Sequence, residues 1–135
     1  MSRLRWLAAS AVCITAAAHA ASDPADPATL KLASRSGCLT CHQVESTAPD
    51  PGATLPVGPA WVDVAARYRG TSGAADQLTR TVLAGSSPYA SHWKGKASGL
   101  AMPPNAVAIS DADARKLVAW ILELDPPGAP AAPKH

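Results

Sequence analysis

The sequence is poor in large aromatic side chains. It has no phenylalanine, two tyrosines and four tryptophans among its 135 residues. A core with so few large apolar side chains is marginal on its own, and small domains of this kind usually depend on a staple or a bound group. We therefore expect something besides the chain's own side chains to complete the core.

Cysteine is scarce too, with three in the chain, of which only Cys38 and Cys41 lie beyond residue 20. Two cysteines exclude a framework of several disulfides.

An excess of positive charge is also missing. Two of the twelve basic residues lie within residues 1–20. Beyond residue 20, ten basic residues match ten acidic ones. This balance gives no support for nucleic-acid binding.

No apolar run is long enough to cross a bilayer, which takes about 20 residues. The candidate at residues 6–18 is short, follows two arginines and ends in the pattern Ala18-His19-Ala20. These features are typical of a secretory signal peptide. We predict that residues 1–20 are a signal peptide and that the mature, exported protein lies in the periplasm with no integral membrane segment.

The remaining chain carries helical signals and no convincing strand pattern, so we predict an all-α domain over residues 21–125. In the last helix, Ser110 and Asp113 resemble a capping box. The long loops 43–58 and 85–109 and a disordered Pro/Ala-rich tail at 126–135 make up the rest. The helices are expected where caps, apolar spacing and Gly or Pro stops agree, over 26–36, 60–68, 73–84 and 111–124.

The segment Cys38-Leu39-Thr40-Cys41-His42 is C-x-x-C-H, the haem c attachment signature. Two cysteines three residues apart on one turn can each add to a vinyl group of one porphyrin. The next residue then directs its imidazole at the iron. The motif agrees with export, and the macrocycle would supply the packing centre that the missing aromatics do not. It predicts one covalently attached haem c.

Three other interpretations of this segment are possible. A thioredoxin-like redox pair needs a strand–helix context, which the sequence does not indicate. A zinc site needs four ligands, and only His92 and His135 remain to complete one. A local disulfide would leave His42 without a role.

Met102 is the only methionine beyond the signal peptide, and therefore the only candidate for a thioether ligand to the iron. Pro103 and Pro104 stiffen the loop that must hold this weak ligand in place. Two alternatives stay open. His92 would give two imidazole ligands and a lower potential, and an open sixth position would allow ligand binding or sensing.

Together these residues resemble the short bacterial class I cytochromes c, soluble periplasmic carriers that feed nitrite reductases and terminal oxidases. The resemblance covers residues 26–124 and implies the cytochrome c fold, with about four helices around one haem. It implies that Cys38 and Cys41 bind the haem, with His42 as proximal and Met102 as distal ligand. Its matching blocks occur in the family order, at 37–42, 57–68, 102–107 and 117–120.

The resemblance also implies supporting roles. The carbonyl of Pro59 would accept the Nδ1 proton of His42. Trp93 and Arg80 would reach the haem propionates, although Trp93 lies farther from Met102 than is usual in the family. Trp61 and Trp120 are expected to be packing residues, with Trp120 where the last helix crosses the first. The loops 43–58 and 85–101 are longer than in the shortest family members.

The predicted function is single-electron transfer between redox protein partners, and the chain itself is not expected to be an enzyme. An alternative is a haem c subunit of a periplasmic dehydrogenase, for example in sulfite or thiosulfate oxidation, with the 85–101 loop as its interface. A haem-based ligand sensor would require that Met102 does not bind the iron. A thiol–disulfide protein would carry no haem. The chain is expected to be a monomer or the small subunit of a complex.

Overall fold

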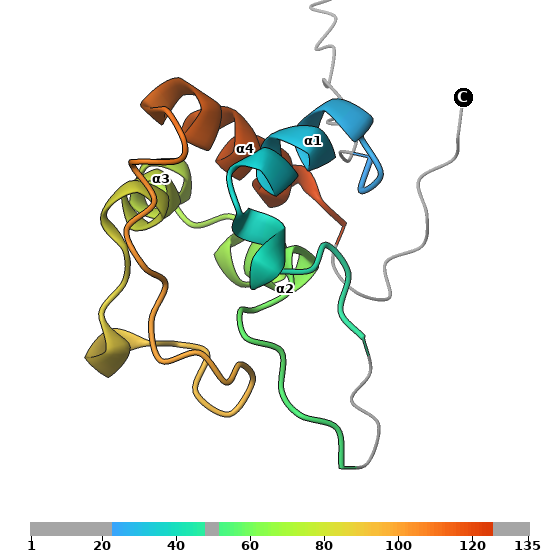
Figure 1. The fold of residues 1–135 in the computed structure, drawn as a ribbon, viewed down its shortest axis with the longest axis vertical. Coiled ribbons are helices and arrows are strands. Elements are labelled where there is room, and N and C mark those ends of the chain that lie inside the picture. The colour runs from blue at the N-terminus through green and yellow to red at the C-terminus, as the bar shows by residue number, and fades with distance from the viewer. Residues whose placement is uncertain (1–22, 48–51, 126–135) are drawn as a thin grey trace, which may run out of the picture.

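The computed structural model describes residues 23–47 and 52–125, and the described part is built from helices and loops (Figure 1). Within these residues no strand forms, and Lys94 and Ala97 make one isolated bridge. The all-α prediction is confirmed. The predicted signal peptide and the predicted tail lie outside the described residues. The elements are α1 (Pro27–Arg35), the 3-10 helix η1 (Cys38–Thr40), α2 (Trp61–Tyr68), α3 (Ala74–Ala84), the 3-10 helix η2 (Pro88–Ala90) and α4 (Asp111–Glu123).

Local capping explains where the first and last helices begin. The Asp26 carboxylate accepts a hydrogen bond from the Thr29 backbone N–H at 2.8 Å, at the start of α1. A side-chain oxygen in this position satisfies one of the N–H groups that the first turn of a helix leaves unpaired. Ser110 caps α4 in the same way, because its Oγ accepts from the Asp113 N–H at 3.1 Å. The predicted capping box is only half formed, since the Asp113 carboxylate lies 3.5 Å from the Arg35 guanidinium instead.

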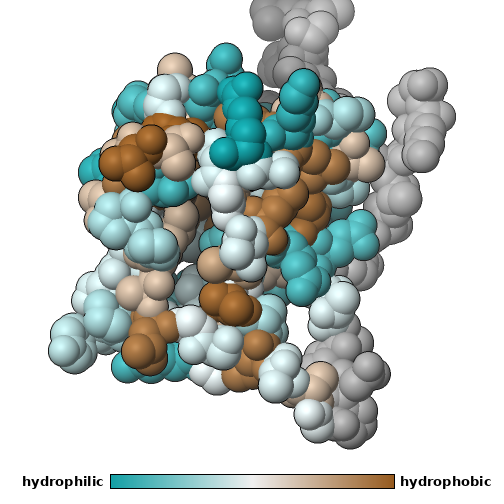
Figure 2. Space-filling model, viewed as in Figure 1, coloured by the Kyte–Doolittle hydropathy of each residue, from teal (hydrophilic) through white to brown (hydrophobic). Residues whose placement is uncertain are grey.

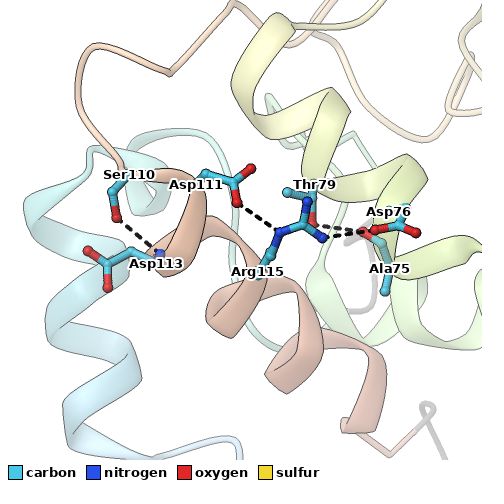
Figure 3. A network of polar contacts seen from close by, with 7 residues as sticks. All are labelled: Ala75, Asp76, Thr79, Ser110, Asp111, Asp113 and Arg115. Atoms are coloured by element: carbon cyan, nitrogen blue, oxygen red, sulfur yellow. Dashed lines mark hydrogen bonds and ion pairs between the residues drawn. The ribbon is translucent and has the colours of Figure 1, made fainter.

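The last helix, α4, packs against α1, α2 and α3 and so holds the fold together. Its apolar face supplies Leu117, Val118 and Ile121, all buried. On its solvent side Arg115 bonds to Asp111 of α4 at 2.8 Å and to Asp76 of α3 at 2.9 Å, as Figure 3 shows. These exposed ion pairs add little to stability, and burial of the apolar face is the main contribution.

The two predicted packing tryptophans lie against each other. Trp61 of α2 and Trp120 of α4 are both buried, with ring centroids 5.6 Å apart and planes at 88°. Edge-to-face pairs of this kind are favourable beyond their buried area. The Trp120 indole also donates to the carbonyl of Asp23 at 3.0 Å, which attaches the segment before α1 to the last helix.

Two loops that are far apart in sequence run side by side below the helices (Figure 1). Ser98 donates its backbone N–H to the Pro56 carbonyl at 2.8 Å, and Gly99 donates to the Val57 carbonyl at 2.9 Å. The Ser98 hydroxyl adds a third bond, to Pro56 at 3.2 Å. Nothing in the sequence indicated this pairing. In the part of the chain that the structure describes, no helix is long and apolar enough to span a membrane.

Candidate cofactor site

A cavity of about 410 Å³ lies between the helices and the paired loops, and it is lined mainly by apolar atoms. Cavities of about 300–1,000 Å³ are typical of small-molecule and cofactor sites. Figure 2 shows hydrophobic residues over the middle and lower part of the face where Figure 1 draws η1 and the loops. The cavity walls include four side chains with sulfur or nitrogen donors that the sequence singled out: Cys38, Cys41, His42 and Met102.

Cys38 and Cys41 reach the cavity from η1 and the residue after it. Gly37 precedes η1 with φ 74°, in the left-handed region, and it turns the chain out of α1. Glycine adopts this conformation without strain because it has no Cβ. Cys38 is buried and Cys41 half-buried, and both are free thiols. Burial raises the pKa of the Cys38 thiol. The two sulfurs are not joined to each other, and both cysteines line the cavity, where each could bind a group held in it.

His42 is held on two sides. Its Nδ1 lies 2.8 Å from the Pro59 carbonyl. Because a carbonyl only accepts, this bond places the proton on Nδ1 and leaves the lone pair of Nε2 available to a metal. The ring stacks on Trp61 with centroids 5.9 Å apart and planes at 21°. Burial lowers the pKa of His42, and the bond to Pro59 opposes that shift, so burial favours the neutral, ligating imidazole.

Gly58, which was not among the predicted site residues, makes this arrangement possible. A Cβ at this position would lie 2.8 Å from His42 Cε1 and 2.9 Å from His42 Nδ1. The backbone N–H of Gly58 donates to the Cys41 carbonyl at 2.8 Å, which brings the two segments together. In the sequence, the pair Gly58-Pro59 indicates the start of a helix. Nothing in that pattern points to the close approach of Gly58 to His42.

Met102 lies far along the sequence from the cysteine motif, in the extended loop before α4, and is half-buried against the core. The loop is anchored at Asn105, a second residue that was not among those predicted for the site. Asn105 donates its side-chain N–H to the Ser36 carbonyl at 3.0 Å and its backbone N–H to the Val82 carbonyl at 3.1 Å. The Met102 loop is thereby tied to both α1 and α3.

Of the other residues predicted for the site, His92 and Trp93 line the cavity and Arg80 does not. His92 is exposed and Trp93 half-buried. The Arg67 guanidinium lies 6.0 Å from the centre of the Trp93 ring, a contact that the sequence did not indicate. A cation at this distance from an aromatic face is attracted to it. Arg80 is exposed on α3 and does not line the cavity. The propionate roles of Trp93 and Arg80 stay predictions.

The zinc and disulfide interpretations find no support in the described ranges. Residues 23–47 and 52–125 contain no cluster of three or more His, Cys, Asp or Glu side chains that could hold a metal ion. The two cysteines are not joined. An apolar cavity with two thiols, one imidazole and one thioether on its walls instead fits a flat, apolar macrocycle with a central metal.

The Cytochrome c family profile matches residues 30–125. The chain belongs to the cytochrome c family. It is 43% identical over 101 residues to cytochrome c-551 of Allochromatium vinosum, a match that covers 75% of this chain and 90% of that protein. It is 39% identical over 122 residues to cytochrome c-552 of Nitrosomonas europaea, covering 88% of this chain and 95% of that protein.

The fold agrees with the family. The crystal structure of wild-type Nitrosomonas europaea cytochrome c552 superposes with a TM-score of 0.56 at 40% identity, over 71% of this chain and 99% of that one. The predicted resemblance and the predicted cytochrome c fold are confirmed. This protein is a small class I cytochrome c, an electron carrier with one covalently attached haem c, and as such it exchanges electrons with redox partners.

Proposed function

We propose that this cytochrome c is an exported, periplasmic one-electron carrier whose haem is bound by Cys38 and Cys41 and ligated by His42 and Met102. We propose further that residues 1–20 are its signal peptide, residues 21–125 its haem domain and residues 126–135 a Pro/Ala-rich tail. One observation carries the ligand set. The two thiols and the imidazole of residues 38–42 and the thioether of Met102, which is 60 positions beyond His42, line one apolar cavity.

Neighbouring groups of the chain orient His42, the proposed proximal ligand. Pro59 holds the proton on His42 Nδ1, and Trp61 fixes the plane of the ring, so that Nε2 is presented in a single orientation. When bound, the haem supplies the one-electron iron couple, and a thioether paired with an imidazole favours the ferrous form relative to two imidazoles. With the haem in place, the mainly apolar walls would keep water from the iron.

Three side chains are proposed to bind the haem propionates: Trp93, Arg80 and Arg67. Trp93 lines the cavity and would donate its indole N–H to a propionate. Arg80 would act from the exposed side of α3, and Arg67, already beside Trp93, offers the same charge. The indole N–H of Trp93 and a guanidinium from either arginine would stabilise a carboxylate at the edge of an apolar site.

Exposed apolar residues support transient docking of redox partners at the paired loops. Val57 and Leu100 line the cavity, yet they are 51% and 82% exposed. Apolar side chains left in water at a functional rim are typical of binding surfaces, and weak electron-transfer encounters bury small areas. A free shuttle is the primary proposal, and a subunit of a periplasmic dehydrogenase is the alternative. Co-purification with a larger catalytic chain would favour the alternative.

The test of the ligand set is the absorption spectrum of the periplasmically matured protein. The ferric wild type should show the weak far-red sulfur-to-iron band. Met102→Ala should lose that band and the high potential while it keeps its haem, and His92→Ala should retain both. A wild type without the band, or a Met102→Ala variant that keeps it, would contradict the proposed ligation.

A further inference from the structure

Ser86 holds the backbone of Met102 from both sides. The Met102 N–H donates to Ser86 Oγ at 2.8 Å. The Ser86 N–H donates to the Met102 carbonyl at 2.9 Å. One residue thus satisfies both polar groups of the Met102 backbone, although the two residues lie 16 positions apart in sequence.

The neighbouring residues make this pair important for the loop. Pro103 and Pro104 have no backbone N–H and cannot donate a hydrogen bond of their own. The next anchor along the chain is Asn105, which is bound to α1 and α3. Met102 therefore depends on Ser86 for the hydrogen bonds that fix its own peptide groups.

Gly85 allows the two segments to approach this closely. Its φ of 83° lies in the left-handed region, which glycine tolerates. A Cβ there would be 2.9 Å from the Met102 carbonyl oxygen and 2.9 Å from the Pro104 nitrogen. The N–H of Gly85 also ends α3 by bonding to the Thr81 carbonyl at 2.9 Å. Ser86 is thereby presented to Met102 from the fixed end of a helix.

We infer that Ser86 is a positioning residue for the Met102 thioether, an assignment that rests on the ligation proposed above. A thioether is a weak ligand, so its competition with other ligands depends on how well its backbone is preorganised. Ser86 fixes the Met102 peptide groups and thereby limits the departure of the sulfur from the iron. Loss of the hydroxyl removes one of the two hydrogen bonds and leaves the other in place.

The test uses the haem-loaded protein and added imidazole, which competes with the sulfur for ferric iron. Ser86→Ala should bind imidazole about 2- to 10-fold more tightly than the wild type, the change expected for the loss of one hydrogen bond. Ser86→Thr keeps the hydroxyl and should restore wild-type affinity. Ser87→Ala is the matched control, because the Ser87 hydroxyl accepts from the Tyr89 N–H and has no bond to Met102.

The outcomes separate this inference from the ligation on which it rests. Met102→Ala should bind imidazole more tightly than any Ser86 variant, since no sulfur competes. If it does and Ser86→Ala matches the wild type, the positioning role is wrong and the ligation stands. If Met102→Ala itself binds imidazole as the wild type does, both are wrong. An equal effect of Ser87→Ala and Ser86→Ala would also overturn the positioning role.

Discussion

The side chain of Asn105 donates a hydrogen bond to the carbonyl of Ser36 at 3.0 Å, across 69 positions of sequence. Ser36 is buried and lies at the end of α1, two residues before Cys38, whose thiol also faces the Ser36 carbonyl at 3.9 Å. The segment that carries the cysteines and the loop that carries Met102 are therefore joined directly. The two sides of the haem site are expected to respond together when this bond is removed.

Asn105→Ala should lower the free energy of unfolding by about 1–3 kcal/mol, because it leaves the carbonyl of the buried Ser36 without the Asn105 donor. It should also weaken the far-red band, because the Met102 loop loses its tie to α1. Denaturant unfolding and the ferric spectrum would measure both effects. Asn105→Asp has the same shape, but its carboxylate cannot donate and would face the Ser36 carbonyl oxygen, so it should be at least as destabilising as Asn105→Ala. Wild-type stability in both variants would show that the bond contributes nothing.

Gly58→Ala should disturb His42 directly. The added methyl group would lie 2.8 Å from His42 Cε1. Overpacking of this kind costs about 1–3 kcal/mol. Because the imidazole must shift from the Pro59 carbonyl, the reduction potential should change together with the stability. Potentiometry and denaturant unfolding of the haem-loaded protein would measure the two.

Gly70→Ala is the control for Gly58→Ala. Its φ of 73° makes any side chain strained, but nothing lies within 4 Å of the added Cβ. Its stability should fall while its potential stays at the wild-type value. A Gly58→Ala variant with an unchanged potential would mean that the imidazole position does not depend on this close approach.

Asp26 should make the stability of α1 depend on pH. Hydrogen bonds from the Thr29 side chain and backbone lower the pKa of Asp26 below its usual 3.8. A carboxyl whose pKa is lower in the folded state stabilises the fold fully above its unfolded pKa. That contribution is lost as the pH falls through the folded pKa.

Asp26→Asn keeps an oxygen that can cap the helix but removes the titration. The wild type should be more stable than Asp26→Asn at pH 7, and the difference should shrink once the pH falls below 3.8, the usual pKa of the carboxyl. Urea unfolding of both proteins over this range would measure the difference. A difference that is the same at all pH values would show that the charge of Asp26 does not act through the cap.

The helices were predictable because their signals are local. Asp26, Ser110 and Gly85 lie where the sequence indicated a cap or a stop, and the observed helix bounds differ from the predicted ones by at most one residue at each end. The attachment motif was equally plain, since the two cysteines and His42 are close together in sequence. Local chemistry accounts for these predictions.

The contacts that shape the distal side were not predictable in the same way. Ser86 and Met102, like Ser98 and Pro56, meet through backbone groups that almost every residue carries, so no side-chain pattern announces them. The choice of arginine shows the same difficulty. Arg67 and Arg80 both lie on helices, and only the tertiary fold places Arg67 beside Trp93.

The hydrogen bonds from Ser98 and Gly99 to Pro56 and Val57 have a consequence for chimaeric design. Replacing either loop alone with a shorter one from a relative would leave carbonyl or N–H groups at the seam without their partners, at a cost for every group that is not resolvated. The two segments are therefore expected to be exchangeable between related proteins only as a pair. Exchanging both segments at once would alter the rim of the site and leave the helices unchanged.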